Sequence, residues 1–297
     1  MPIASARSAG LALTLAATVV FTASCSARAQ NSEHEWQKEY PVSGSPSLTI
    51  ETADSNLDIH SCGDCKTIRI HVHSDEKLSN FHLEERQEQD HVYFALKEKH
   101  LGIGVRVNWK NKTTQVTVET PASLDLDAKT ADGNLSARTL AGNLQVHSGD
   151  GNVTLEDVRG SLRLTSSDGN ISIHNANGTL EARAADGHMK IDGQFTAVQL
   201  HTSDGNLDFA LAPGSQLTAA SRIESSDGRV SIRVPQNLAA DLDVSTSDGH
   251  LDCALPLVMD HYSSDESSKR HLRGRLNAGG VPLSIHTSDG NVSIANL

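Results

Sequence analysis

Apolar and polar residues alternate along most of the chain, in repeating blocks of about 18 residues. In the first half of a block the apolar side chains fall two positions apart, as at Leu135 and Ala137. In the second half the same alternation returns, as at Leu144 and Val146. A period of two is typical of half-buried β-strands. Each block therefore predicts two short strands, separated by turns at an Asp-Gly dipeptide and near Gly142 in the first of them.

The Asp-Gly dipeptide sets the period of the repeat. Its aspartates recur at strictly equal intervals, at Asp132, Asp150, Asp168, Asp186 and Asp204. Later copies at Asp227, Asp248 and Asp289 are more widely and unevenly spaced, which indicates insertions in those coils. Residues 53–57, Ala-Asp-Ser-Asn-Leu, resemble a degenerate early copy.

A unit of about 18 residues cannot bury its own apolar face, so it must stack on copies of itself. The pattern predicts an all-β protein: a parallel β-solenoid with two short strands per coil, neighbouring coils about 4.8 Å apart, and almost no helix. Leu135, Leu162, Ile171 and Leu180 are expected to point inward.

Local chemistry predicts the turns. Glycine supplies a positive φ, and the aspartate carboxylate accepts hydrogen bonds from neighbouring backbone groups. The asparagines that follow the Asp-Gly pairs are expected to stack as an amide ladder, interrupted by His188, Arg229 and His250. These asparagines are Asn134, Asn152, Asn170, Asn206 and Asn291.

The chain divides into four parts on these grounds. Residues 1–29 are expected to be a signal peptide, 30–45 a linker, 46–122 a strand-rich N-terminal region that caps the solenoid, and 123–297 the solenoid, with a polar loop at 260–276. Alternation upstream of the repeats predicts strands near residues 48–50, 68–72, 92–96, 105–107 and 116–118.

The first residues carry an export signal. Arg7 precedes an apolar run, Leu11 to Phe21, that is too short to span a membrane, and small residues follow it. Cleavage after the A-x-A site at 27–29 would leave a soluble chain that begins at Gln30. A lipobox-like Ala-Ser-Cys would instead place a lipid anchor on Cys25. No later stretch is long and apolar enough for a transmembrane helix.

Cysteine usage fits an oxidising compartment. Cys62 and Cys65 form a C-x-x-C between strand-like segments, without the helical pattern that follows a redox-active pair. A disulfide that closes a short turn is the interpretation we favour over a redox-active pair or half of a zinc site. Cys253 is left without a partner and is expected to be buried.

Charge and composition exclude some functions. The formal net charge of −12 would repel a phosphate backbone, so nucleic-acid binding is not expected. Aromatic residues make up only 3 % of the chain, which argues against stacking platforms for bases or sugars.

The tandem turns, with the pattern [ST]-[SA]-D-G-[NH]-[LIV], and the closing segment 272–292 resemble the bacterial putative adhesin domain family over residues 40–297. The resemblance implies an exported β-solenoid of the cell envelope: periplasmic, secreted or on the cell surface. It supplies no catalytic residues and no cofactor. Export, repetition and the lack of a converging site lead us to expect an adhesin or sensing scaffold that binds a protein or glycan of the envelope.

Two further interpretations stay open. The aspartate row (Asp132, Asp150, Asp168, Asp186, Asp204) offers oxygen ligands for calcium, as in β-roll proteins, but it lacks their full nonapeptide motif. Neighbouring carboxylates about 5 Å apart in water repel by only about 0.8 kcal/mol, so no ion is required.

A carbohydrate-active enzyme is the other alternative, because parallel β-helices host such enzymes. Pairs such as Glu156 with His174, or Asp192 with Glu181, can be nominated as acid and base, but the repeating polar face singles out none. His71 with His73, and His147 with His201, are the metal-ligand candidates, for which solvated strand histidines are the simpler interpretation. No nucleophile, metalloprotease or phosphate-loop motif is present. The sequence thus favours a non-enzymatic scaffold.

Overall fold

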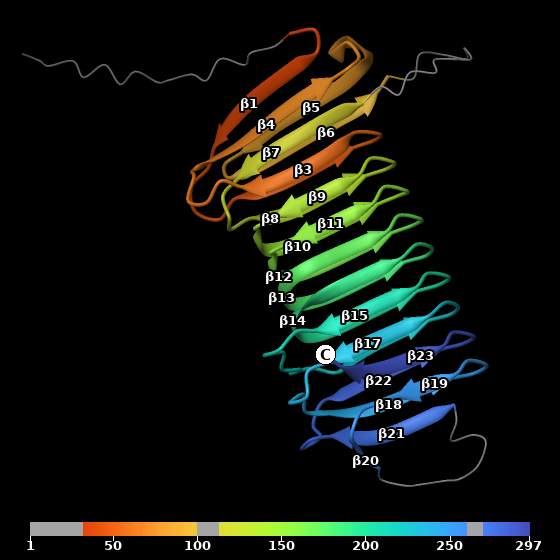
Figure 1. The fold of residues 1–297 in the computed structure, drawn as a ribbon. Helices are drawn as coiled ribbons and strands as arrows, with labels where there is room; N and C mark the ends of the chain where they lie inside the picture. The colour runs from red at the N-terminus through yellow and green to blue at the C-terminus, as the bar shows by residue number, and fades with distance from the viewer. Residues whose placement is uncertain (1–31, 100–112, 260–269) are drawn as a thin grey trace, which may run out of the picture.

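The computed structural model describes residues 32–99, 113–259 and 270–297, and forms a long stack of two facing β-layers (Figure 1). The prediction of an all-β solenoid is confirmed. Within the described residues the helical content is one short 3-10 helix, η1 (Leu78–Asn80). The signal-peptide prediction for residues 1–29, the lipidation candidate Cys25 and the expected strand at 105–107 all lie outside these ranges.

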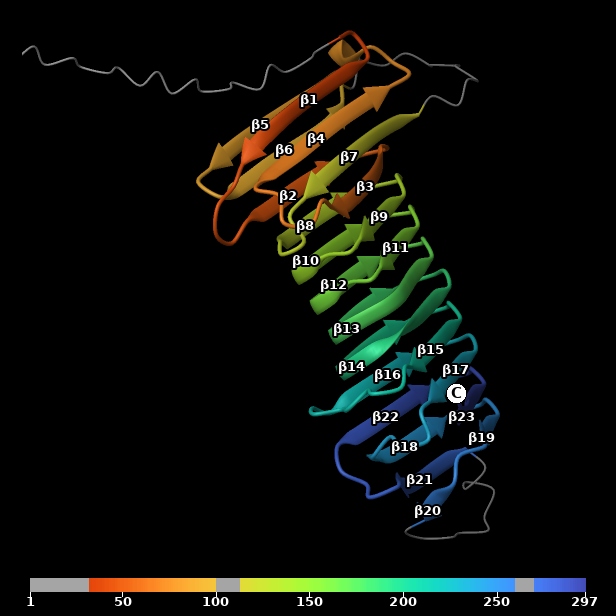
Figure 2. The same ribbon diagram turned by 60° about the vertical axis from the view of Figure 1, so that its left-hand side comes forward.

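Layer 1 holds the longer strands of the coils, and its central strands are parallel (Figure 2). In spatial order it contains β5 (Phe81–Glu88), β6 (His91–Glu98), β2 (Ser47–Thr52), β8 (Asp125–Thr130), β10 (Ala141–Ser148), β12 (Arg159–Ser166), the ends of β13 (Ile171–Ala184) and β14 (Met189–Thr202), then β16 (Ser221–Ser225), β22 (Pro282–Thr287), β18 (Ala240–Thr246), β21 (His271–Leu276) and β20 (Leu257–Met259).

Layer 2 faces it across the core. In spatial order it contains β1 (Glu35–Pro41), β4 (Thr67–Ser74), β7 (Thr114–Thr120), β3 (Asn56–Ser61), β9 (Leu135–Arg138), β11 (Val153–Glu156), the beginnings of β13 and β14, then β15 (Leu207–Leu211), β17 (Val230–Val234), β23 (Val292–Asn296) and β19 (Leu251–Cys253).

Equivalent apolar residues form ladders inside the stack. Leu162 of β12 lies in register with Leu144 of β10 on one side and Leu180 of β13 on the other. These side chains are buried, as are Leu135 and Ile171, so the expected inward positions are confirmed. One continuous hydrophobic core runs through all the coils.

The first regular coil lies upstream of the strict repeat. Strand β2 pairs in parallel with β8, and β3 pairs in parallel with β9, so the turn between them at residues 53–55 stacks on the Asp-Gly turns. Antiparallel pairs β5–β6, β4–β7 and β1–β4 then finish the N-terminal end of the stack.

Residues 30–45 were expected to be a linker, and this was wrong for β1, which pairs antiparallel with β4. Trp36 and Tyr40 of β1 are buried, and the Trp36 ring lies 5.4 Å from the ring of Phe94. Because the three residues between Trp36 and Tyr40 are polar, the segment lacks the apolar alternation that marks the other strands. Lys38 of β1 donates to Glu85 of β5 over 2.5 Å, which joins the edges of the two layers.

The last coils do not stack in chain order. Strands β22 and β23, which follow all the others in sequence, lie between the coil of β16 and β17 and the coil of β18 and β19 (Figure 1). The polar loop expected at 260–276 is corrected in part, because residues 271–276 form β21, which pairs antiparallel with both β18 and β20. Residues 260–269 lie outside the described ranges.

Candidate functional site

The five candidate calcium ligands lie along one edge of the stack, at the turns between the layers. Asp132, Asp150, Asp168, Asp186 and Asp204 are all exposed. None of their carboxylates makes a hydrogen bond or ion pair with another described residue. Among the described residues, no group of three or more His, Cys, Asp and Glu side chains is placed to hold a metal ion.

In three of these five turns a buried hydroxyl group, and not the aspartate, hydrogen-bonds the backbone carbonyl of the glycine. The hydroxyl of Ser148 donates to the Gly151 carbonyl over 2.7 Å, and Thr130 donates to the Gly133 carbonyl over 3.1 Å. The role assigned to the carboxylate was therefore wrong. A serine or threonine stands two positions before each of these aspartates except Asp186, where the residue is Ala184, and it was already visible as the first position of the repeated turn pattern.

The glycine of the Asp-Gly pair has the expected positive φ at Gly187 and Gly228. At Gly151 and Gly169, among others, its φ lies outside the left-handed region, so the glycine is needed there for another reason. A Cβ atom on Gly169 would instead lie 2.1 Å from the carbonyl oxygen of Gly151 in the neighbouring coil. Close stacking excludes a side chain here, whereas positive φ values occur at the second turn, as at Gly160.

The amide ladder is confirmed. The side chain of Asn152 donates to Oδ1 of Asn134 over 3.0 Å, and Asn170 donates to Oδ1 of Asn152 over 2.9 Å. The ladder extends to Asn56 in the first coil and ends at His188, which contributes only its backbone N–H.

The structure brings together one of the two nominated acid–base pairs, because Glu156 and His174 lie in register on β11 and β13. His174 pairs with Asp192 at 2.9 Å on layer 2, and this hydrogen bond raises the pKa of the imidazole. Glu181 projects from layer 1, on the opposite side of the stack, where hydrogen bonds from Arg163 and Arg183 lower the pKa of its carboxyl. Asp192 and Glu181 therefore cannot act on one substrate atom.

The candidate metal-binding histidines each lie beside a partner of another kind. His73 lies 3.5 Å from Glu35, and His201 lies 3.7 Å from Glu224. The His147 ring is within 2.9 Å of the Gln145 amide. His71 faces Thr117 and Gln37 on the neighbouring strands.

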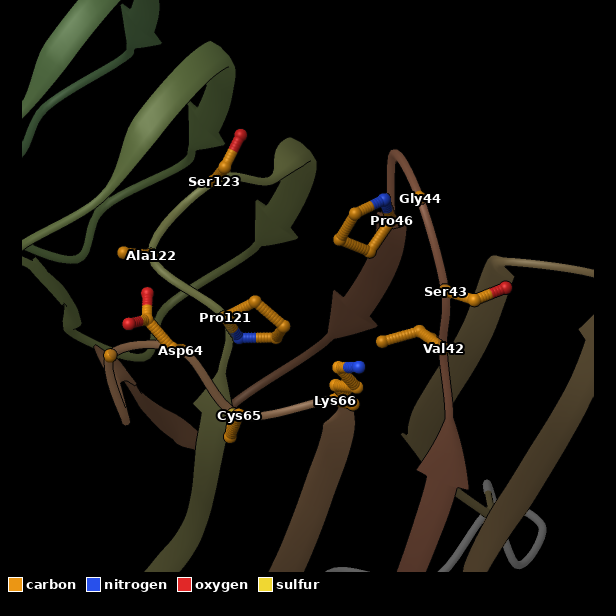
Figure 3. A pocket seen from close by; sticks show the side chains of 11 residues that line it. Val42, Ser43, Gly44, Pro46, Asp64, Cys65, Lys66, Pro121, Ala122 and Ser123 are labelled. Carbon is orange, nitrogen blue, oxygen red and sulfur yellow. The ribbon is translucent and has the colours of Figure 1, made fainter.

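The structure joins Cys62 and Cys65 in a disulfide, with the Cα atoms 5.8 Å apart, and Cys65 lines a groove of about 380 Å³ (Figure 3). Three loops form this groove, at residues 42–46, 63–66 and 121–123. The loop of the disulfide connects the other two, because Gly63 O accepts from Ala122 N–H and Lys66 O accepts from Val42 N–H.

Two ionisable side chains line the groove. Its ionisable members are Asp64 and Lys66, and the remaining walls are largely aliphatic or glycine, with Pro46 and Pro121 opposite each other in Figure 3. Cys253 lies elsewhere, half-buried on β19, where burial raises the pKa of its thiol.

We predict that replacing both Cys62 and Cys65 by serine lowers the free energy of unfolding by about 2 kcal/mol, since the disulfide closes a very short loop. Urea unfolding of the chain from residue 30, with and without reductant, measures this difference. Cys253→Ser is the control and should not respond in the same way to reductant. Titration of three free thiols in the unreduced, unfolded chain would contradict the disulfide.

A row of paired charges covers part of the outer face of layer 1. Arg163 of β12, Arg183 of β13 and Arg222 of β16 project from this face, and each contacts a glutamate. A depression of about 200 Å³ lies between Arg183 and Arg222. This group cannot be recognised within a single repeat of the sequence, but the outward columns of the aligned repeats place its residues together.

No described helix of the protein has the length and apolar character that crossing a membrane requires.

The sequence model of a family described as Toastrack DUF4097 matches residues 46–295. No curated protein gives a significant match.

Several solved structures resemble the chain at low identity. A putative cell adhesion protein from Clostridium sporogenes is 10 % identical, with 88 % of this chain and 99 % of that chain covered and a TM-score of 0.28. A putative adhesin from Bacteroides fragilis is 13 % identical, with coverages of 90 % and 98 % and a TM-score of 0.35. A putative adhesin from Parabacteroides merdae is 11 % identical, with coverages of 88 % and 96 % and a TM-score of 0.35.

Proposed function

This chain belongs to the Toastrack DUF4097 family, as its resemblance to the putative adhesin domain family indicated, and we propose that it is a non-enzymatic scaffold of the bacterial envelope. In this proposal the rigid solenoid presents its outer polar faces to a protein or glycan partner. The chain is exported by residues 1–29 and is either released from Gln30 or anchored by a lipid on Cys25.

The observation that carries the proposal is the arrangement of polar side chains on the two outer faces. On layer 2, Arg69 bridges Glu39 at 2.6 Å and Glu119 at 2.5 Å, and Arg138 lies 3.0 Å from Asp58 in the same layer. Ladders of this kind hold many side chains in fixed positions over a long surface. Such a surface suits the binding of an extended partner better than catalysis at a single site.

The disulfide and the turn chemistry support the same proposal. A bond between Cys62 and Cys65 persists in an oxidising compartment, which fits an exported protein. The hydroxyl-to-carbonyl hydrogen bonds within the turns and the asparagine ladder between them stiffen this edge of the solenoid.

Cosedimentation of the purified chain, residues 30–297, with a bacterial envelope fraction tests the proposal. We expect saturable binding, which survives protease treatment of the envelope if the partner is a glycan, or periodate treatment if it is a protein. The absence of saturable binding would overturn the scaffold function. Release of reducing ends from envelope polysaccharide by the pure chain would favour the enzyme alternative instead.

A further inference from the structure

Four neighbouring strands of layer 1 place two columns of side chains on the outer face of the solenoid. In register, Arg163, Glu181, Gln199 and Arg222 form one column, and Thr165, Arg183, His201 and Glu224 form the other. We call Arg163, Arg183 and Arg222 the arginine patch. Four strands span about 14 Å along the axis, since strands lie about 4.8 Å apart.

The glutamates hold the arginines in place and lie deeper than they do. Arg163 Nε donates to Glu181 over 3.0 Å, and Arg183 bonds the same carboxylate. Arg222 donates to Glu224 over 2.9 Å. The arginine side chains are 55 to 61 % exposed, whereas those of Glu181 and Glu224 are 27 % and 37 % exposed. The surface that a partner meets is therefore mainly guanidinium.

Each guanidinium keeps hydrogen-bond donors for a ligand. A guanidinium has five N–H groups in a planar fork, and the ion pairs described here use only some of them. Its geometry matches a carboxylate, which it binds through two parallel hydrogen bonds. Three arginines and two glutamates give this surface a net positive charge, whereas the formal net charge of the whole protein is −12. This local excess of positive charge marks a site for an anion.

The surroundings of the patch indicate which kind of anion it fits. Gln199 and His201 lie between the arginines, and Gln145 and Ser284 continue the columns on either side, so groups that bind hydroxyls alternate with groups that bind charge. The two columns contain no aromatic side chain on which a base could stack.

We propose that the arginine patch binds a linear acidic polysaccharide, with its carboxylates on the guanidinium groups and its hydroxyls on Gln199. This inference rests on the proposed envelope scaffold and names its partner class. The ligand lies along the solenoid axis and across the depression between Arg183 and Arg222.

Binding of polygalacturonate to the chain from residue 30 tests the proposal, with neutral dextran as the comparison polymer. Replacing Arg183 and Arg222 by glutamine removes two charge-assisted contacts and should weaken binding about tenfold or more. The matched control is Lys190→Gln with Arg233→Gln, two exposed cations of layer 2, which changes the net charge equally and should change affinity less than about twofold. Equal melting temperatures show that both double variants are folded.

Three results would overturn the site. They are no binding of polygalacturonate by the unmodified chain, equal weakening in both double variants, and tighter binding to duplex DNA or phosphatidylglycerol vesicles than to polygalacturonate. If the unmodified chain still binds the envelope fraction in any of these cases, the scaffold function survives and only the arginine patch is wrong. If envelope binding is also absent, the scaffold function is wrong as well.

Discussion

Replacing Leu162 by aspartate is expected to lower the free energy of unfolding by about 4 kcal/mol or more, because it places an unpaired charge in the core. Leu162 is 1 % exposed and lies between Leu144 and Leu180 in one inward ladder. Each coil of a solenoid is stabilised only by its neighbours. The loss should therefore extend to the coils on both sides.

Thr165→Asp is the matched control for Leu162→Asp. Thr165 follows on the same strand and is exposed, so its replacement should change stability by no more than about 0.5 kcal/mol. Urea unfolding followed by circular dichroism measures both variants, and hydrogen exchange shows which coils open. If the two variants were equally stable, the inward position of Leu162 would be contradicted.

The second large effect is expected at the Asp-Gly turns. Gly169→Ala should destabilise the protein by about 3 kcal/mol, because the new Cβ would lie 2.1 Å from the Gly151 carbonyl oxygen. The contact is with backbone, which can move only if the two coils separate. The parallel hydrogen bonds around the turn, such as Asp168 N–H to Gly149 O at 3.2 Å, would lengthen with it.

Two controls separate this clash from the chemistry expected from the sequence. Gly63→Ala places a side chain at a φ of +78° in open space, so it should cost only about 1 kcal/mol. Asp168→Asn alters an exposed carboxylate without a side-chain partner, and should change stability by about 0.5 kcal/mol or less. If Gly169→Ala proved as mild as Gly63→Ala, stacking would not be the reason for the glycine.

Local sequence patterns could predict single residues of the candidate site, but not which of them lie side by side. Glu181 could be nominated from the sequence, but its two arginine partners lie one on the neighbouring strand and one two positions along its own strand. The charge of the patch becomes visible only when the outward columns are read across coils. Pairing register, not spacing within one coil, brings Arg163, Arg183 and Arg222 onto a single surface.

At the N-terminal end of the stack, the sequence predicted the inner strands and missed two strands at the edges. The sequence predicted strands at 48–50, 68–72, 92–96 and 116–118, where apolar alternation is regular, and strands are present there. It missed β1 and β5, which are edge strands rich in charged residues. Edge strands bury fewer side chains and gain from charges that prevent further pairing, so their sequences lack the signal on which the prediction depends.

By itself, the sequence determined the length of the repeating coil, the side chains that point inward and the position of each turn, because a period of two assigns every side chain to one face. Only the tertiary structure decided which coils are neighbours at the C-terminal end. All Asp-Gly coils present nearly the same ladders, so the coil of Asp289 fits equally well against several others. Its place between the coils of Asp227 and Asp248 follows from the pairing of β18 with β22 on one side and β21 on the other.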